Sequence, residues 1–219
     1  MDTSYGLRMQ VQHPFRTVTP TLDGEVLAVL AGADAGFTPP QVHRLIGGRS
    51  EAGVRKSLQR LVEQGVVTDE RVGKAVSYRL NRRHLAALHI TALARLYHEL
   101  LDRIRAELGR WQPPAEYVAL FGSASRRDMR PDSDIDLLVV RGDDVKGDDP
   151  VWRDQLDALA ESVTAWTGND ARVLELSAAE VRIGLDEGQP MYDDIRREGV
   201  SLHGRADYLK RFLGRASMP

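Results

Sequence analysis

The residues with the clearest chemical content are two aspartates that follow a Gly-Ser pair at a spacing of ten intervening residues. Gly122-Ser123 ends one apolar run, and Asp134 and Asp136 open another that continues through residues 137–140. Because side chains alternate along a strand, we expect both carboxylates on one face, about 7 Å apart along the backbone. A strand this apolar is expected to be buried, and unpaired carboxylates are costly to bury. The pattern therefore indicates that both aspartates ligate a divalent cation.

The Gly-Ser pair suits an anionic ligand. Gly122 has no Cβ, so the backbone can approach a phosphate closely. The Ser123 hydroxyl and the N–H groups of the following turn can hold anionic oxygens. Together with the aspartates, the pair predicts a site for a nucleoside triphosphate and Mg²⁺ or Mn²⁺.

These residues resemble the signature of the minimal nucleotidyltransferases of the DNA polymerase β superfamily, a Gly-Ser followed by Asp-x-Asp. The resemblance covers roughly residues 115–204 and is carried by residues 121–124 and 133–138, with residues 195–200 similar to the family's usual ending. It implies that Asp134 and Asp136 bind metal. It also implies that Gly122, Ser123 and Arg126 hold the nucleotide, and that NMP passes from an NTP to a hydroxyl by two-metal catalysis.

Two positions depart from the family pattern. Arg127 stands where the family commonly has glycine. The family also has a third carboxylate on a nearby strand, where the best alignment leaves Arg172 or Leu174. Glu175 is the first choice as a substitute, Asp170 is the second, and the remaining alternative is that no acid completes the site. In that last case we expect Arg172 to pair with the aspartates, which would leave a nucleotide sensor.

The N-terminal part of the sequence predicts three short helices followed by a β-hairpin. The helices are expected to begin after Thr21, Thr38 and Ser50, and the strands to span 66–68 and 75–80, around a polar turn. That order resembles winged-helix regulators over residues 21–83, and we expect a winged helix-turn-helix domain at 17–83.

The third of these helices carries side chains suited to DNA. Val54, Leu58 and Leu61 face inward, which leaves basic and amide side chains outside, where a major groove could be contacted. The expected DNA contacts also include one arginine at the helix entry and two cations on the hairpin: Arg49, Arg55, Lys56, Gln59, Arg60, Arg71 and Lys74. Residues 1–83 hold 12 Lys and Arg against 8 Asp and Glu, whereas the remaining residues are net acidic. A solvated basic face is the alternative to a double-stranded DNA partner.

Between these two regions, residues 84–112 predict one long connecting helix, because leucine and isoleucine recur along it and no proline interrupts it. A helix longer than usual either joins two domains or pairs with a second copy, so a homodimer is expected. Strands and helices alternate after Pro113-Pro114 and predict a small-sheet, nucleotidyltransferase-like domain at 113–219. The predicted fold class is α+β, with an N-terminal winged helix, a connecting helix and this C-terminal domain.

Composition excludes several other classes. The chain of 219 residues has no cysteine, so disulfides and thiol chemistry are ruled out. No run of about 18 apolar residues could span a membrane, and residues 1–16 lack the apolar core of a secretory signal. The sequence therefore predicts a cytoplasmic protein without a membrane partner.

The leading interpretation is a DNA-binding transcriptional regulator that carries a magnesium-dependent nucleotidyltransferase-type domain. This domain is expected to bind NTP, with transfer of NMP to a hydroxyl acceptor as its reaction. One alternative is an antitoxin-type nucleotidyltransferase that modifies a partner toxin, a protein acceptor, and autoregulates its operon. A second is a catalytically inactive, nucleotide-sensing repressor, and a third is an antibiotic nucleotidyltransferase.

Overall fold

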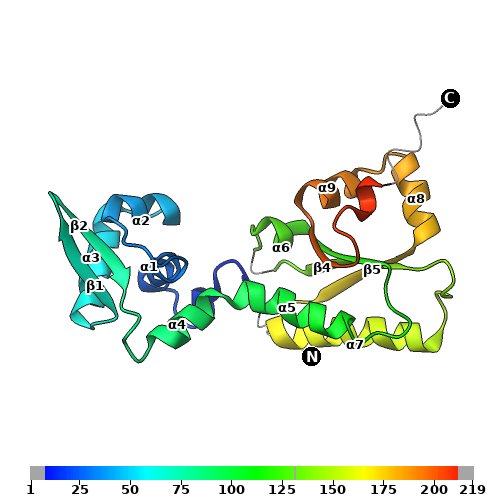
Figure 1. The fold of residues 1–219 in the computed structure, drawn as a ribbon, viewed down its shortest axis with the longest axis horizontal. Coiled ribbons are helices and arrows are strands. Elements are labelled where there is room, and N and C mark those ends of the chain that lie inside the picture. Colours follow the sequence, from blue (N-terminus) through cyan, green and yellow to red (C-terminus); the bar gives the residue numbers. More distant parts are fainter. Residues whose placement is uncertain (1–7, 131, 212–219) are drawn as a thin grey trace, which may run out of the picture. The chain divides into compact units, whose positions relative to one another are not determined.

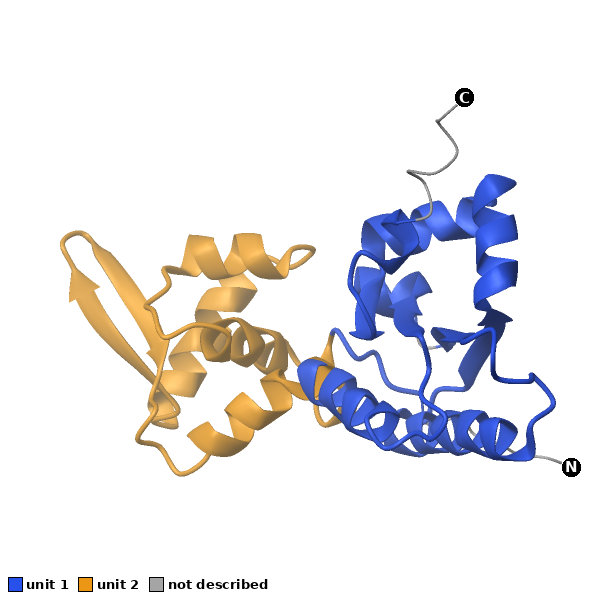
Figure 2. Ribbon diagram, turned by 45° about the vertical axis from the view of Figure 1, so that its right-hand side comes forward, with its two compact units in different colours: residues 1–12, 98–219 blue, residues 13–97 orange. Residues whose placement is uncertain are grey.

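The computed structural model describes residues 8–130 and 132–211, and the chain divides into two compact units. One unit comprises residues 13–97, and the other combines residues 1–12 with residues 98–219 (Figure 2). Each unit has its own hydrophobic core. None of the helices in the described part of the chain is long and apolar enough to cross a membrane.

The unit of residues 13–97 has the predicted order of three helices and a hairpin, followed by a fourth helix. Its elements are η1 (Pro14–Thr17), α1 (Leu22–Ala31), α2 (Pro39–Ile46), α3 (Glu51–Glu63), β1 (Val67–Val72), β2 (Ala75–Leu80) and α4 (Ala87–Ala94). The first three helices begin directly after Thr21, Thr38 and Ser50, as the sequence predicts. Two of these starts have side-chain caps: the Ser50 hydroxyl accepts a hydrogen bond from the Gly53 N–H at 3.1 Å, and Thr38 forms a capping box with Gln41. The helix starts are therefore determined locally.

The hairpin is longer than predicted. β1 and β2 pair in antiparallel fashion from Val67 opposite Leu80 to Val72 opposite Ala75, so the turn is only Gly73 and Lys74. Arg71 consequently lies on strand β1, and Lys74 lies at the tip. The expected polar turn belongs mostly to the strand because its exposed, charged residues are stabilised by ladder hydrogen bonds rather than by burial.

The predicted continuous helix over residues 84–112 is interrupted. Arg95 leaves the helical conformation, and it separates α4 from α5 (Leu96–Leu108). The apolar residues of this segment serve two different units, because Ile90 of α4 packs in the core of residues 13–97, whereas α5 belongs to the other unit from His98 onward. The boundary between the two compact units lies between Tyr97 and His98, near the start of α5.

The second unit is built on a four-stranded sheet. Its elements after α5 are β3 (Tyr117–Phe121), α6 (Gly122–Arg126), β4 (Ile135–Arg141), α7 (Pro150–Thr167), β5 (Ala171–Ser177), α8 (Ala178–Asp186), α9 (Pro190–Glu198), β6 (Val200–His203) and η2 (Tyr208–Lys210). The strand order is β5-β4-β3-β6, with β4 and β5 parallel and β3 antiparallel to both of its neighbours. The predicted mixed α+β architecture with small sheets is confirmed.

Helices cover both faces of this sheet (Figure 1). On one face, Leu138 and Val140 of β4 pack with apolar residues of α8 and α9. On the other face lie α5 and α7, which contact each other where the Arg103 guanidinium stands 5.7 Å from the centre of the Trp166 ring. The central strand β4 is therefore buried on both faces, and polar groups can reach solvent only near its ends.

Candidate functional site

The Gly-Ser pair and the second aspartate meet at one edge of the sheet. Antiparallel pairing of β3 with β4 sets Phe121 opposite Asp136, so Gly122 follows directly at the end of β3. Gly122 has φ +70°, and a Cβ added there would stand 2.5 Å from Oδ2 of Asp136. Only glycine combines this backbone conformation with this close approach. The structure thus brings together Gly122 and Asp136, which are separated in the sequence.

Asp136 is a half-buried carboxylate on the same face of β4 as Leu138. Within the described part of the chain it takes part in no hydrogen bond or ion pair. Burial raises the pKa of Asp136, the negative charge of Asp134 raises it further, and the guanidinium groups of Arg172 and Arg126 act in the opposite direction. A carboxylate in this setting would be stabilised by a cation close to it.

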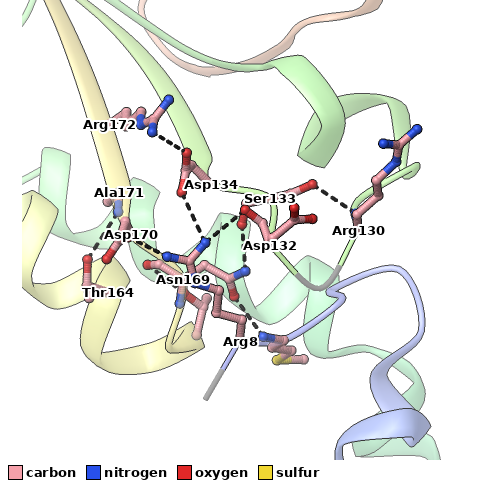
Figure 3. Close-up of polar contacts among 12 residues, drawn as sticks. Arg8, Arg130, Asp132, Ser133, Asp134, Thr164, Asn169, Asp170, Ala171 and Arg172 are labelled. Atoms are coloured by element: carbon pink, nitrogen blue, oxygen red, sulfur yellow. Dashed lines mark hydrogen bonds and ion pairs between the residues drawn. The ribbon is translucent and has the colours of Figure 1, made fainter. Parts of the chain in front are cut away.

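Asp134 precedes β4 and already has cationic neighbours. Nη2 of Arg172 lies 2.8 Å from its Oδ2, and Nη1 of Arg8 lies 3.7 Å from its Oδ1 (Figure 3). The Asp134 side chain is only 14% exposed. The two predicted metal ligands therefore differ in their ion pairs. Two arginines contact Asp134, whereas no arginine among the described residues forms an ion pair with Asp136.

The structure does not bring Glu175 to the aspartates, which corrects the first-choice assignment of the third carboxylate. In the parallel register of β4 and β5, Arg172 is the partner of Asp136, whereas Glu175 is the partner of Val139. Because side chains alternate along a strand, Glu175 points to the opposite face from Arg172. There its Oε1 lies 2.6 Å from Nε of Arg141.

The remaining alternatives are both visible in the structure. Arg172 contacts Asp134, as expected if no third acid completes the site. Asp170 lies beside the aspartate loop, since its carbonyl accepts a hydrogen bond from the Ile135 N–H at 2.9 Å. Among the described residues, however, no three His, Cys, Asp or Glu side chains are grouped closely enough to hold a metal ion. A metal here would have two protein carboxylates and would need oxygens from its nucleotide or from water.

Arg8 is a site residue that the sequence analysis missed. Its Nη2 lies 2.7 Å from Oδ2 of Asp170, and its Nη1 donates to the carbonyl of Asp132 at 2.8 Å. More than 120 positions separate Arg8 from either partner. No local pattern in the sequence could have indicated this contact, because it depends on the path of the N-terminal segment across the folded unit.

The other predicted nucleotide-binding residues, Ser123 and Arg126, belong to α6. Ser123 is half-buried in its first turn, and Arg126 lies near the end of the helix, with Nε 3.2 Å from Asp128 and Nη1 3.7 Å from Glu198. Arg127 ends the helix at φ +60°, a conformation that glycine adopts far more easily. This left-handed position gives a physical reason for the glycine that the family commonly has there.

The predicted DNA contacts on residues 13–97 separate into two sets. Arg49 pairs with Glu25 through two hydrogen bonds of 2.9 and 2.8 Å, and Arg60 pairs with Asp23. Arg55 pairs with Glu51 along its own helix. The others are exposed, and within the described residues Lys56, Gln59 and Lys74 form no hydrogen bond or ion pair through their side chains, while Arg71 contacts only the carbonyl of Gly73.

Comparison with known proteins supports the assignment of the second unit. The family model "Nucleotidyltransferase domain" matches residues 101–190. This segment contains the Gly-Ser turn, both aspartates and strands β3 to β5, so this part of the chain has the nucleotidyltransferase fold. The resemblance seen in the sequence is confirmed at that level. No curated protein sequence matches the chain significantly.

Several solved structures are similar to about half of the chain. A toxin-antitoxin with AMP-PNP is 19% identical over 52% of this chain and 82% of its own, with a TM-score of 0.36. A mutant of the toxin-antitoxin MntA-HpeT is 17% identical over 53% of this chain and 86% of its own, with a TM-score of 0.38. A putative nucleotidyltransferase from Sulfolobus solfataricus is 21% identical over 49% of this chain and 79% of its own, with a TM-score of 0.30.

Proposed function

We propose that the protein is a DNA-binding transcriptional regulator whose second unit binds a nucleoside triphosphate together with Mg²⁺ or Mn²⁺. One observation carries the nucleotide part of the proposal: Asp136 is a half-buried carboxylate without a partner among the described residues, next to Asp134 and pressed against Gly122. A divalent cation would satisfy both carboxylates with the oxygen ligands that it prefers. The chemistry of the donor set therefore fits the metal that the fold family uses.

Each residue of the site has a distinct proposed role. Asp134 and Asp136 would hold the cation, and the bound cation would neutralise the phosphates of the nucleotide. The N–H groups after Gly122 and the hydroxyl of Ser123 would bind the phosphate oxygens. Arg126, at the other end of the same short helix, would add a positive charge near the nucleotide.

Arg172 favours nucleotide sensing over catalysis. It occupies the position on β5 opposite Asp136, where a third carboxylate would complete a two-metal site, and it pairs with Asp134 instead. A cationic side chain there repels a second metal ion. We therefore propose that nucleotide binding, and not nucleotide consumption, is the main property of the unit.

A second candidate function is NMP transfer to a hydroxyl acceptor, including an acceptor on a partner protein of the toxin-antitoxin kind. The observation in its favour is the position of Asp170. The guanidinium of Arg8 contacts both the carboxylate of Asp170 and that of Asp134, so Asp170 lies close to the aspartate loop. If Arg8 moved away, the carboxylate of Asp170 would be available as a third acid in place of Glu175.

Incubation with NTP labelled at the α-phosphate tests these two candidates. We expect Mg²⁺-dependent retention of nucleotide by the wild type, loss of retention in Asp136→Asn, and no covalent label on the protein or on components of a cell extract. Covalent labelling that disappears in Asp136→Asn would establish transfer and reject the sensor.

For residues 13–97 we propose a winged helix-turn-helix that binds double-stranded DNA. The order α1, α2, α3 and hairpin supports this, as does the exposure of Lys56, Gln59 and Lys74. Arg49 and Arg60 would instead hold α3 and its entry against α1, since both pair with acids of α1. Side chains without intramolecular partners can reach phosphates and base edges at the smallest cost.

We also propose that the protein is a homodimer in solution. Because α4 and α5 are separate helices, they cannot form the single long apolar face that the sequence predicts for pairing with a second copy. Leu85 and Leu88, however, are 94% and 75% exposed just before and within α4. A second copy that covers this pair would remove two large apolar side chains from water.

A further inference from the structure

The first described residues form a strap across the second unit. In this strap (residues 8–12), the Met9 N–H donates to Oδ1 of the buried Asn169 at 2.9 Å, and the side-chain amides of Gln10 and Gln12 donate to the carbonyl of Met129 at 2.9 and 2.8 Å. Val11 is buried. The strap thus joins the segment before Asp134 to the turn before β5.

Asn169 links the strap to the aspartate loop. It accepts from the Met9 N–H, and its Nδ2 donates to the carbonyl of Ser133 at 2.9 Å. The docked strap and the backbone next to Asp134 are therefore connected through one fully buried side chain, and displacement of the strap would leave Asn169 without one of its partners.

At the start of the strap, the guanidinium of Arg8 lies between Asp134 and Asp170 (Figure 3). It lies 3.7 Å from Oδ1 of Asp134, while Arg172 contacts Oδ2 of the same carboxylate. Both oxygens of Asp134 therefore face an arginine. The two arginines are not equivalent, since Arg172 is 73% exposed, whereas Arg8 is fixed by Asp170, by a backbone carbonyl and by the rest of the strap.

We propose that the strap is an internal latch in which Arg8 competes with a divalent cation for Asp134. This inference rests on the proposed metal site at Asp134 and Asp136. A guanidinium and a metal ion at the same carboxylate oxygen repel each other, so the site accepts the metal fully only when Arg8 withdraws. Because coupling between two binding events is reciprocal, metal binding releases the strap to the same extent that the docked strap weakens metal binding.

Mn²⁺ titration of the full-length protein without nucleotide tests the latch. We expect Arg8→Gln to bind Mn²⁺ roughly 5-fold or more tightly than the wild type, which is the lower end of usual coupling between sites. Arg8→Lys keeps the positive charge but lacks the planar, bidentate guanidinium. Its Mn²⁺ affinity is expected to lie between those of the wild type and Arg8→Gln. The matched control is Arg153→Gln, since Arg153 is an exposed arginine of α7 whose side chain pairs with no described residue, and its Mn²⁺ affinity should equal that of the wild type.

Hydrogen exchange of the wild-type protein is a second test of the latch, and it requires no variant. Addition of Mn²⁺ should accelerate exchange of the Met9 amide, whose partner is Asn169, and leave exchange in the hairpin of β1 and β2 unchanged. A merely structural strap would not respond to the metal.

The outcomes separate the latch from the metal site. If the wild type and Arg8→Gln bind Mn²⁺ equally, and Asp136→Asn abolishes binding in both, the latch is rejected and the metal site stands. If neither the wild type nor the double variant Arg8→Gln/Arg172→Gln binds Mn²⁺, the proposed metal site is rejected, and the latch with it.

Discussion

A side chain at position 122 would need the space that the carboxylate of Asp136 occupies. We predict that Gly122→Ala lowers nucleotide affinity at least 10-fold, because its Cβ would displace Oδ2 of Asp136, which lies 2.5 Å away. The positive φ adds about 1–2 kcal/mol of backbone strain. Isothermal titration with nucleotide and Mg²⁺ measures the first effect, and thermal unfolding measures the second.

Gly188 provides a matched control for this substitution. It has φ +68°, and a Cβ there would meet nothing within 4 Å. Gly188→Ala should therefore cost similar backbone strain without altering nucleotide affinity. Equal losses of affinity in the two variants would contradict the role of Gly122 as a close neighbour of Asp136.

At the residue scale, the sequence indicates those candidate site residues that depend on a local pattern. Asp134 and Asp136 are proposed from their spacing of two residues, which is local, although β4 begins only at Ile135. Gly122 is proposed because a turn after a strand favours glycine, and the structure places it against Asp136. Glu175 was chosen wrongly because the face it occupies depends on the register between β4 and β5. Arg8 could not be predicted, since its contacts join segments far apart in the chain.

At the scale of elements, one carboxylate of α1 organises the entry to α3. Glu25 accepts from Arg49 and Arg16, and these hydrogen bonds lower the pKa of Glu25 from its usual 4.5 to about 2, against the opposing effect of burial. A lowered pKa means that Glu25 stabilises the folded state fully above pH 4.5, and that this contribution is lost as the pH falls toward about 2.

We predict that Glu25→Gln lowers the free energy of unfolding of residues 13–97 by about 1 kcal/mol at neutral pH, a figure reduced because both arginines are partly exposed. The variant should also lose less stability than the wild type as the pH falls from 4.5 toward 2. Urea denaturation followed by NMR signals of α1 and α3 measures both effects. Glu63→Gln, an exposed acid of α3, is the control, and equal destabilisation by both variants would argue against the proposed contacts.

Lys56 and Arg60 of α3 are expected to have different roles, because only Arg60 forms an ion pair with an acid of α1. Lys56→Ala should weaken DNA binding and reduce the slope of log affinity against log salt by about 1, because one phosphate contact is removed. Arg60→Ala should chiefly lower the stability of residues 13–97, since Asp23 loses its ion pair with Arg60 and, among the described residues, keeps only the hydrogen bond from the Ser57 hydroxyl. Fluorescence anisotropy with double-stranded DNA over a salt series separates the two, and an unchanged slope for Lys56→Ala would exclude that lysine as a phosphate contact.

The starts of the first three helices follow from the sequence, and α1 begins directly after Thr21 although Thr21 makes no capping hydrogen bond. Ser50 and Thr38 begin their helices as predicted, because the capping hydrogen bonds are local. The segment around Arg95 was predicted as one helix, since apolar residues recur on both sides of it. The spacing of these residues does not show that they belong to two different units. The interruption between α4 and α5 could therefore not be predicted from the sequence.

At the scale of the whole molecule, self-association should depend on the exposed pair Leu85 and Leu88. We predict that wild-type protein sediments as a dimer and that Leu85→Gln/Leu88→Gln sediments as a monomer at the same concentration. Nucleotide binding should be unchanged in this variant, because the pair lies in the unit of residues 13–97. A wild-type monomer, or a variant that remains dimeric, would remove this surface as the interface.

We propose above all that Asp134 and Asp136 bind a divalent metal together with a nucleoside triphosphate. The most direct measurement is calorimetric titration of the full-length chain with ATP, CTP, GTP and UTP, with Mg²⁺ and with EDTA, for the wild type and for Asp134→Asn/Asp136→Asn. We predict that at least one nucleotide binds the wild type only with Mg²⁺ and does not bind the double variant. Binding that is indifferent to both Mg²⁺ and the substitutions, or no binding of any nucleotide by the wild type, would contradict it.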